Sequence, residues 1–508
     1  MINHLILLLR KNVEKWGILF VLLVFSLPGK SFQRETGDSI HYLPEVSVSS
    51  GWMEGKLKKN SGSISLAWVE NNAPSLGSLL NALPGIWIQD GAVNTQRITL
   101  RGMGSRTPYA SNRIMAYLND IPITYAGGFT SLDQLDVASL DRIEVIKGPS
   151  SALYGSGLGG AIRAITSRSG ETLKTGFRSA SFNTGWFTSG MARSTPEQHV
   201  QWSWNERWSN GYRQNSRFSK TNLLFEGERK IGNASLGLLL LYHRLDAQIA
   251  SSLDEQTFTN HPSAAASNWL AVQGYERSSR ILAGASVKNT FSPSFSNKLI
   301  VFGSISDEWE RRPFNNLGTE LQMAGLRDLL FYHRKQIDIT LGGEWLLEKN
   351  DVLLTEPVTI PSGTWINRNS EQRSVVNLFG SLRYSPFPFL QLTAGLNANK
   401  LHSVLSDLFP DNGDQSGINL HSPIVSPRVG LSVELSQQLV LFGSFGHGFS
   451  HADFEEGLLP DGSYNLSLRP EQGWMGEAGV RFFSRKKTYY SELGVYAISL
   501  NNLLLTRR

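Results

Sequence analysis

The sequence predicts an all-β transmembrane β-barrel preceded by a small α+β domain. Three observations support this fold class. Apolar and polar residues alternate through the second half of the chain, short and long connections take turns between the alternating segments, and residues 62–168 follow neither pattern. Alternation with a period of two indicates strands. The regular change in connection length is typical of outer-membrane barrels.

The composition excludes several other classes of protein. Of the 508 residues, 40% are hydrophobic and 10% are aromatic, which excludes a disordered chain or a coiled coil. With 48 Lys and Arg against 43 Asp and Glu, the net charge of +5 is too weak and too dispersed to indicate a nucleic-acid surface. The chain has no cysteine, so disulfides, thiolate metal sites and cysteine nucleophiles are excluded.

The N-terminus predicts a signal peptide over residues 1–31. Basic residues precede an apolar stretch at 16–27 that is too short to span a bilayer, and the small residues Gly29 and Ser31 follow it. We expect cleavage after Ser31 and export without a lipid anchor, because no cysteine follows. A buried N-terminal helix is the alternative. No later apolar run is long enough to predict a transmembrane helix.

Period-two alternation predicts about fifteen strands in a barrel that occupies residues 169–508. At one of them, Val429 and Leu431 fall on one face, whereas Arg428, Gly430 and Ser432 fall on the other. The expected strands are 173–180, 185–193, 198–206, 217–227, 232–243, 279–290, 296–307, 320–332, 336–341, 372–385, 390–399, 428–435, 438–449, 473–483 and 487–499.

The connections distinguish a membrane barrel from a soluble sandwich, whose strands also alternate. If the strands run up and down, all the short turns fall on one rim and all the long loops fall on the other. That is the layout of outer-membrane barrels. Short links at 194–197, 228–231, 292–294 and 386–388 take turns with long ones at 244–278, 308–319, 348–371, 401–422 and 450–471.

Residues 62–168 are predicted to form a compact domain that plugs the barrel lumen. A barrel of about 22 strands encloses a lumen that must be filled to keep the membrane sealed. The domain begins with a short amphipathic helix at 75–83, which Pro84 and Gly85 terminate. Its strands are expected at 86–89, 97–101, 114–118, 142–147 and 161–166.

Four motifs in this domain resemble the plug of TonB-dependent outer-membrane receptors of the iron-siderophore type. They lie at 75–86, 97–102, 141–155 and 159–162, in the order and at the spacing of that family. The resemblance implies that Arg101, Arg142 and Glu144 hold the plug against charges of the barrel wall. The motif residues are Pro84, Gly85, Arg101, Gly102, Arg142, Glu144, Gly148, Pro149, Tyr154, Gly155, Gly159 and Gly160.

The resemblance continues into the barrel. Gly448 and Phe449, followed by acidic residues, and the segments 468–471 and 477–479 are similar to stretches of the later barrel in that family. One departure lies at 119–122, where Asn-Asp stands in place of the usual Asp-Gly. Asn and Asp tolerate a left-handed backbone, so we expect the same turn.

A segment after the signal peptide resembles the TonB box and lies in a linker at 32–61. A periplasmic partner can hold such a segment by adding a strand edge to it. Pro44 disfavours a helix there, and Val46 and Val48 favour an extended chain. The alternative is that the segment is the first strand of the plug. The TonB-box residues are Leu43, Pro44, Glu45, Val46, Ser47, Val48 and Ser49.

The resemblance implies active uptake of a scarce ligand, driven by the inner-membrane proton gradient through TonB. The protein would be a monomer among the lipids of the outer membrane of a diderm bacterium, without a cofactor and without nucleic acid. The ligand expected from the family is a ferric siderophore or another metal chelate. Arg106, Tyr109 and Arg113 are candidate contacts, because Arg and Tyr suit an anionic chelate. The alternative is that they cap the loop.

Two further signals carry less weight. The sequence G-x-G-x-x-G at 155–160 precedes β-branched residues, so we predict a plug turn in place of a nucleotide site. A metal site is one interpretation of His447 and His451, which lie near Asp453, Glu455 and Glu456. The two histidines straddle a strand end and an external loop, where imidazoles seldom converge, so we interpret them as part of a solvated loop. The sequence shows no serine elbow, metal-binding helix or pair of carboxylates in a soluble context, so it does not predict an enzyme.

The end of the sequence disagrees with a complete receptor. An odd number of strands would leave the chain end on the external rim, whereas bacterial barrels close with even numbers. Residues 501–508 resemble the approach to another loop. We therefore expect that about seven strands of a design of roughly 22 are missing. A nonfunctional truncated receptor fragment, a passive outer-membrane porin and a secreted β-rich adhesin or enzyme are the alternatives.

Overall fold

The structure is a computed structural model. The signal peptide at 1–31, the TonB box at 43–49, and the candidate contacts Arg106 and Tyr109 lie outside the residues that it describes, so these assignments stay predictions. The described residues are 62, 64–68, 75–90, 93, 96–104, 112–149, 151–166, 171–357, 364–409, 411, 413–457, 464–465, 467–485 and 489–504.

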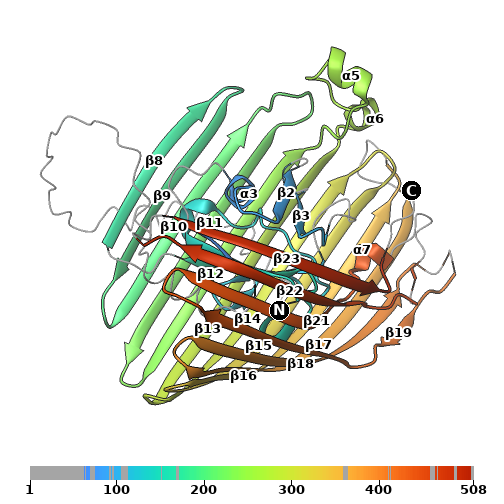
Figure 1. Ribbon diagram of the computed structural model, residues 1–508. Helices are drawn as coiled ribbons and strands as arrows, with labels where there is room; N and C mark the ends of the chain where they lie inside the picture. The colour runs from blue at the N-terminus through green and yellow to red at the C-terminus, as the bar shows by residue number, and fades with distance from the viewer. Residues whose placement is uncertain are drawn as a thin grey trace, which may run out of the picture. The chain divides into compact units, whose positions relative to one another are not determined.

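The larger sheet is a meander in which each strand is antiparallel to its neighbours (Figure 1). Only the short β19 departs from the path, because it pairs with β18 while β18 also pairs with β20. In the order of the described strands, β8 and β23 are the two edges. The strands are β8 (Glu171–Ala180), β9 (Thr184–Ser194), β10 (Gln198–Ser209), β11 (Phe218–Ile231), β12 (Ala234–Gln248), β13 (Tyr275–Ser292), β14 (Phe295–Arg311), β15 (Asn316–Arg334), β16 (Ile337–Thr355), β17 (Trp365–Phe387), β18 (Leu390–Asp407), β19 (Gly417–Leu420), β20 (Ile424–Glu434), β21 (Leu439–Ser450), β22 (Glu471–Phe483) and β23 (Tyr490–Asn501).

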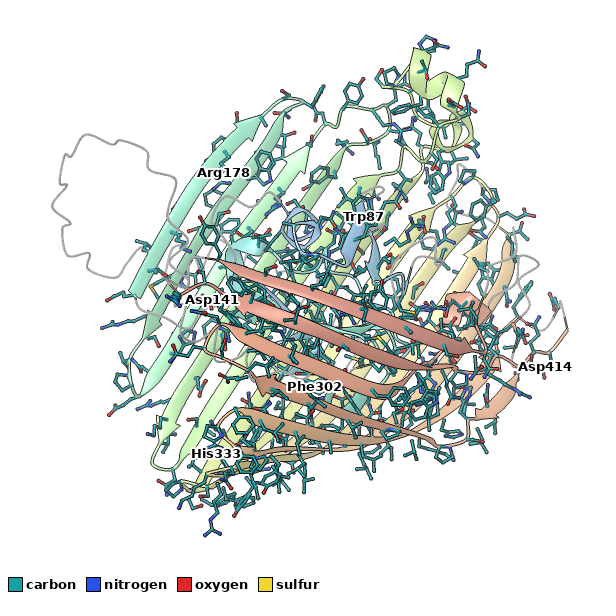
Figure 2. All side chains as sticks on the ribbon, viewed as in Figure 1. Trp87, Asp141, Arg178, Phe302, His333 and Asp414 are labelled. Carbon is teal, nitrogen blue, oxygen red and sulfur yellow. The ribbon has the colours of Figure 1, made fainter. Side chains whose placement is uncertain are left out.

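The predicted alternation of the strands is confirmed. On β20, Val429 and Leu431 are exposed, whereas Ser432, the residue after Leu431, is buried. Figure 2 shows side chains on both faces of the sheet and labels the buried Phe302 of β14 and the exposed Arg178 of β8. The exposed apolar side chains of the outer face are what a lipid-facing band requires.

The predicted long loops at 308–319 and 348–371 are wrong, because strands occupy most of both. Between β14 and β15 only 312–315 remain, and between β16 and β17 only 356–364 remain. These hairpins continue as hydrogen-bonded ladders that contain Leu317, Val352 and Leu354 as well as charged and polar residues. Backbone hydrogen bonds hold a ladder whatever the order of its side chains, so the strands extend beyond the alternating pattern that the sequence shows. The short turns predicted at 292–294 and near 388 are confirmed.

The N-terminal α+β domain, hereafter the plug, forms two small sheets. The larger has the order β1-β6-β7-β4-β5, with β4 and β7 parallel, and the smaller pairs β2 with β3. The elements are β1 (Ile64–Trp68), α3 (Leu76–Asn81), β2 (Ile86–Asp90), β3 (Gln96–Leu100), β4 (Ile114–Leu118), β5 (Ile121–Pro122), η1 (Val137–Ser139), β6 (Leu140–Lys147), α4 (Ser151–Tyr154) and β7 (Gly160–Thr166).

Most plug elements match the sequence-based expectation, but the short elements β1, β5, η1 and α4 were not expected. The turn expected at 119–122 is confirmed, because Asn119 adopts a φ of 55° and links β4 to the two-residue β5. Such short elements carry too few residues for a periodic signal, so they depend on packing.

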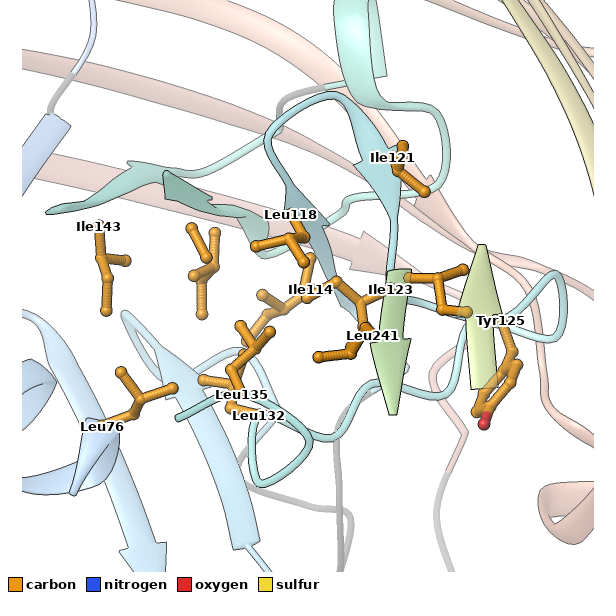
Figure 3. Packing of buried hydrophobic residues seen from close by; sticks show 14 of the residues in the cluster. Leu76, Ile114, Leu118, Ile121, Ile123, Tyr125, Leu132, Leu135, Ile143 and Leu241 are labelled. Carbon is orange, nitrogen blue, oxygen red and sulfur yellow. The ribbon is translucent and has the colours of Figure 1, made fainter. Parts of the chain in front are cut away.

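The hydrophobic core of the plug continues into the inner face of the larger sheet. Ile114 and Leu118 of β4 are fully buried in one cluster with Leu241 of β12 and Leu282 of β13 (Figure 3). Because both faces contribute, the plug is packed against the wall by burial of apolar area as well as by polar contacts. Among the described residues, no helix is long and apolar enough to cross a membrane.

Candidate functional site at the contact of plug and wall

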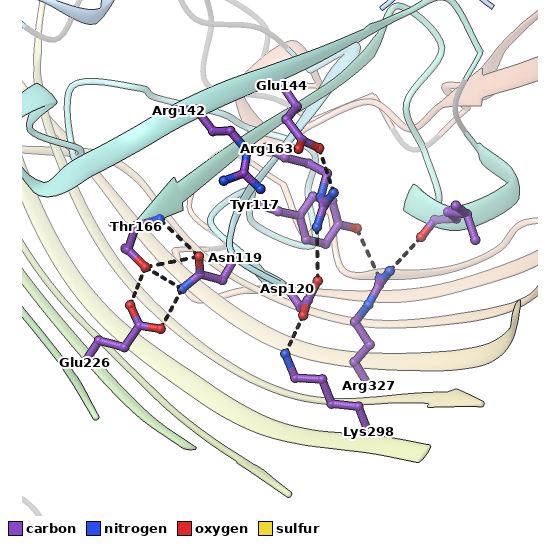
Figure 4. Close-up of polar contacts among 11 residues, drawn as sticks. Tyr117, Asn119, Asp120, Arg142, Glu144, Arg163, Thr166, Glu226, Lys298 and Arg327 are labelled. Atoms are coloured by element: carbon purple, nitrogen blue, oxygen red, sulfur yellow. Dashed lines mark hydrogen bonds and ion pairs between the residues drawn. The ribbon is translucent and has the colours of Figure 1, made fainter. Parts of the chain in front are cut away.

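The turn between β4 and β5 presents a carboxylate to two cations. Oδ1 of Asp120 lies 3.4 Å from Nη2 of Arg163 in β7, and Oδ2 contacts Nζ of Lys298 in β14 (Figure 4). Burial alone would raise the pKa of Asp120, but Lys298 and Arg163 together lower it to about 2. The carboxylate is therefore ionised at neutral pH, and it connects the plug to a strand of the wall.

Asn119 in the same turn donates a hydrogen bond to a carboxylate of the wall, that of Glu226. Its Nδ2 donates to Oε1 of Glu226 on β11 at 3.2 Å and to Oγ1 of Thr166 at 3.1 Å. The hydroxyl of Thr166 donates to the other oxygen of Glu226 (Figure 4). Glu226 is buried, and hydrogen bonds from the plug offset the free energy that burial of its charge costs.

A buried ion pair of the wall holds the plug at a third point. Nη1 of Arg327 on β15 lies 2.6 Å from Oε2 of Glu344 on β16, and the two side chains are only 5% and 1% exposed. Nη2 of Arg327 donates to the carbonyl oxygen of Leu153 at 2.8 Å, and Nη1 donates to the hydroxyl oxygen of Tyr117 at 3.5 Å. Burial raises the pKa of Tyr117, so its hydroxyl group stays neutral.

Arg101, predicted as a motif residue, contacts the wall at β22 and β23. It follows β3 in the left-handed region, with φ 51°, and Gly102 continues the turn with φ 82°. Nη1 of Arg101 lies 2.7 Å from Oε2 of Glu477 on β22. Its guanidinium also lies over the ring of Tyr496 on β23, 4.7 Å from the centroid. Arg101 thus contacts two wall strands.

The motif residues Arg142 and Glu144 contact partners within the plug. Nη1 of Arg142 lies 3.0 Å from Oδ2 of Asp141, and its Nε lies 3.4 Å from Oε1 of Glu144. Nη1 of Arg163 lies 2.8 Å from the other oxygen of Glu144. Since Arg163 also contacts Asp120, these charges form a chain that reaches the wall at Lys298.

Two motif glycines permit close approach of the backbone. At Gly160, φ is 139°, and a Cβ atom there would overlap the carbonyl oxygen of Ile146. At Gly148, φ is 86°, and a Cβ atom would overlap the side chain of Met475 on β22. Both positions disfavour any other residue because of backbone strain, and Gly160 also lacks space, since its neighbour is a backbone carbonyl.

The other motif residues lie at turns and at contacts with the wall. Pro84 and Gly85 follow α3, where Gly85 has φ 75°. The carbonyl oxygen of Pro149 accepts a hydrogen bond from Nη1 of Arg428 at 2.9 Å. Tyr154 packs its ring 5.2 Å from that of Tyr117, Gly155 faces Asn377 of the wall, and the amide of Gly159 donates to the carbonyl oxygen of Arg113 at 2.7 Å.

Arg113 is the one candidate ligand contact among the described residues. Its Nε lies 2.8 Å from Oε2 of Glu471, the first residue of β22, and its Nη1 lies 2.6 Å from Oε1 of Glu456 in α7 (Phe454–Gly457). The guanidinium is 6% exposed. These two carboxylates occupy much of its donor capacity, and contact with a ligand stays a prediction.

The interpretation of His447 and His451 as part of a solvated loop is wrong, because both side chains are buried. His447 lies within β21, whereas His451 follows its last residue, and both rings pack against wall side chains, Trp474 and Phe449 respectively. Nδ1 of His447 lies 2.9 Å from Oγ of Ser426, and Nε2 of His451 lies 2.8 Å from Oδ1 of Asn399. Burial lowers the pKa of His451 to about 3, so the imidazole is neutral at physiological pH.

Sequence reasoning missed the wall half of this interface. A signal exists for the residues that lie in expected strands, such as Glu226, Lys298 and Arg327, because the alternation assigns their positions to the inner face. Glu348 and Glu471 lie in segments expected to be long loops, where the sequence gives no such signal. A charged residue facing a lumen that a plug fills requires a partner. The missed wall residues are Glu226, Lys298, Arg327, Glu344, Glu348, Arg428, Glu471 and Glu477.

The arrangement keeps lumen-facing charges paired while the plug is in place. Oε2 of Glu348 accepts from the amide of Ala126 at 2.7 Å, and its Oε1 accepts from that of Gly127 at 3.2 Å. Within the described ranges, no group of three or more His, Asp or Glu side chains is placed to hold a metal ion. The interface is therefore a set of contacts that hold the plug in place and that would break if the plug moved.

Two family models match the two parts of the chain. Residues 64–162 match the TonB-dependent receptor plug domain, and residues 158–508 match the TonB-dependent receptor-like β-barrel. The chain therefore belongs to the family of TonB-dependent receptors, which are proteins of the bacterial outer membrane.

The matches between this chain and its curated relatives cover less than two thirds of the relatives' length. The vitamin B12 transporter BtuB of Vibrio vulnificus (strain CMCP6) is 34% identical over 103 residues, which are 20% of this chain and 16% of that protein. The ferrioxamine receptor of Yersinia enterocolitica is 32% identical over 101 residues, which are 20% and 14% of the two proteins. A longer match, 22% identical to BtuB of V. vulnificus (strain YJ016), covers 81% of this chain and 62% of that protein.

Solved structures share the fold. The ferric citrate transporter FecA in its unliganded form superposes with a TM-score of 0.75 at 13% identity, over 89% of this chain and 72% of FecA. The ferric yersiniabactin uptake receptor FyuA of Yersinia pestis superposes with a TM-score of 0.71 at 14% identity, over 88% and 73% of the two chains. At such identities the likeness concerns the fold.

Proposed function

We propose that this protein is a TonB-dependent receptor that takes up a ferric siderophore or another metal chelate across the outer membrane. The inner-membrane proton gradient drives the uptake through TonB, which binds on the periplasmic side. In this proposal, residues 1–31 are the signal peptide, 32–61 carry the TonB box, 62–168 form the plug and 169–508 belong to the barrel.

One observation carries the proposal: the plug satisfies charges on the inner face of the wall from several directions. Arg101 pairs with Glu477, Asn119 with Glu226, and Arg113 with Glu471. A passive pore needs an open lumen, whereas contacts of this kind close it and would require energy to break. The names of the relatives support the ligand class, because they include a ferrioxamine receptor and a hemin receptor.

The experiment that tests the proposal measures uptake of a ligand panel by cells that express the chain. The panel contains radiolabelled ferric siderophores, haem and cobalamin, and the host lacks its own receptors for them. We expect energy-dependent accumulation of one chelate. Equal entry of all panel members, rising in proportion to their concentration, would indicate a porin.

The substitution Val46→Pro is expected to abolish uptake, whereas binding of the ligand to cells should persist. Proline removes a backbone donor and disfavours the extended strand pairing that a TonB box offers its partner. The measurement is the uptake rate of the transported ligand beside its binding at low temperature. Val46→Ile is the matched control, because it preserves β propensity, and it should transport at the wild-type rate. Normal transport by the proline variant would show that 43–49 is not the TonB box.

A further inference from the structure

Two imidazoles meet at the rim of the barrel where the long loops lie. His421 lies between β19 and β20, and His451 follows the last residue of β21. Their ring centroids are 5.7 Å apart, with an angle of 52° between the ring planes. In an outer-membrane barrel this rim faces outward, because the short turns face the periplasm. The pair therefore lies on the side from which a ligand arrives.

The Nε2 atom of the buried His451 ring is held by a hydrogen bond to Asn399. Nε2 of His451 lies 2.8 Å from Oδ1 of Asn399, and Nδ2 of Asn399 donates to Oδ1 of Asn377 at 2.6 Å. This second bond orients the Asn399 amide so that its oxygen faces the imidazole. A neutral His451 must then hold its proton on Nε2 and donate it, which leaves the lone pair on Nδ1.

The other nitrogen, Nδ1 of His451, is buried and has no hydrogen-bond partner among the described residues, although the side chain is only 3% exposed. A buried polar atom of this kind costs free energy unless a ligand satisfies it. An imidazole whose second nitrogen is held by a hydrogen bond is the usual arrangement of a metal-binding histidine. Asn399 supplies that bond here.

The spacing of the two rings suits one metal ion between them. Metal–nitrogen bonds of histidine are about 2.0–2.1 Å, so two rings that share one ion have centroids roughly 4.5–6.4 Å apart, depending on the angle between the two bonds at the metal. The observed 5.7 Å falls in that interval. Two imidazoles are too few to hold a bare ion, and no third His, Asp or Glu of the described part of the chain completes a group with them. The remaining ligands must therefore arrive with the metal.

The charged groups beside the pair are themselves paired. Nη1 of Arg373 donates to the carbonyl oxygen of Ala452, the residue after His451, at 2.9 Å, and its Nε lies 2.9 Å from Oε1 of Glu371. Because a carboxylate balances this guanidinium, a chelate is favoured by the number of ligands that the metal still needs.

We propose that His421 and His451 coordinate the metal ion of an incompletely saturated transition-metal chelate at the outward rim, with Asn399 as a positioning residue. This inference rests on the proposed function and adds to it the way in which the ligand is held. A chelate with vacant coordination positions would be selected over one whose metal is fully enclosed.

The test uses nickel nitrilotriacetate, an anionic chelate with two neighbouring positions open to imidazoles. We measure its binding to the purified full chain in detergent by calorimetry and by the visible absorption of the nickel ion. We expect one bound chelate, with the absorption shift of imidazole coordination. The variants His421→Ala and His451→Ala should each lose the shift and raise Kd more than about tenfold, and Asn399→Leu should raise Kd about 10–100-fold.

Two controls, and one variant that is expected to fold, make the test decisive. His402→Ala removes an exposed histidine of β18 and should leave Kd unchanged. Nickel ethylenediaminetetraacetate, whose metal is saturated, should not bind. Because His421 is only half-buried, His421→Ala is expected to fold even where His451→Ala does not. Wild-type binding by a folded His421→Ala variant, equal binding of the saturated chelate, or an equal loss in His402→Ala would overturn the proposal.

The outcome is separable from that of the proposed function. Binding in detergent needs neither TonB nor a proton gradient. If uptake fails while nickel nitrilotriacetate binds through the two histidines, transport is refuted and the site stands. If energy-dependent uptake occurs while the histidine variants bind normally, the site is refuted and transport stands.

Discussion

A disulfide between plug and wall, made by the paired substitutions Ser139→Cys and Ser203→Cys, is expected to stop uptake and to release it after reduction. The hydroxyl oxygens of Ser139 in η1 and Ser203 on β10 lie 2.6 Å apart, and both residues are buried. The chain has no cysteine, so no other disulfide can form. A ligand can pass the filled lumen only if the plug moves or rearranges, and the covalent link prevents separation at this point.

The control for this prediction links two wall strands in place of plug and wall. The hydroxyl oxygens of Thr184 and Ser209, on β9 and β10, lie 2.7 Å apart, so Thr184→Cys with Ser209→Cys offers a similar spacing. Uptake should persist in that oxidised variant. Gel mobility with and without reductant verifies each disulfide. Unchanged uptake with the plug verifiably linked to β10 would show that the plug does not have to leave that strand.

The second large effect concerns stability. Glu344→Ala should lower the free energy of unfolding by about 3–5 kcal/mol, because removing one partner leaves the buried guanidinium of Arg327 without its counter-charge. That guanidinium also holds the plug through the carbonyl oxygen of Leu153, so we expect the plug contact to weaken with it. Urea unfolding of the purified chain in detergent, followed by tryptophan fluorescence, measures the change.

Two variants define the cause of that loss. Asp246→Ala removes the partner of Arg277 in an exposed pair, with the Asp246 side chain 37% and the Arg277 side chain 58% exposed, and should cost only about 0–1 kcal/mol. Glu344→Gln retains an acceptor for Arg327 and should cost less than the alanine variant. An alanine variant as stable as Asp246→Ala would mean that solvent reaches Arg327 and that the pair does not hold the plug.

Much of the fold could be predicted because its signals are local. On β20 the alternation of Val429, Leu431 and Ser432 is visible without any knowledge of the neighbouring strands. The plug turns could be predicted from glycines whose backbone other residues adopt only with strain, as Gly148 and Gly160 show. Asn119 adopts the left-handed backbone at the β4–β5 turn, as could be expected because Asn tolerates that conformation.

The remainder depends on which residues meet in space. The strands β16 and β17 extend into a predicted loop because a ladder of backbone hydrogen bonds continues beyond the segment in which apolar and polar residues alternate strictly. The partners of Arg101 and Arg113, Glu477 and Glu471, are more than 350 residues away in the chain, so no local pattern pairs them. His451 looked like a loop residue because its burial comes from Asn399, His421 and Phe449, and the first two lie on other elements that a local pattern does not contain.

The most direct test of the central claim is the uptake rate of the transported chelate before and after a protonophore collapses the inner-membrane proton gradient. A receptor that depends on TonB should stop accumulating ligand, while ligand binding to the cell surface continues. The same result is expected in a strain without TonB. Uptake that continues at an unchanged rate in both conditions would contradict the account and would identify the lumen as a passive pore.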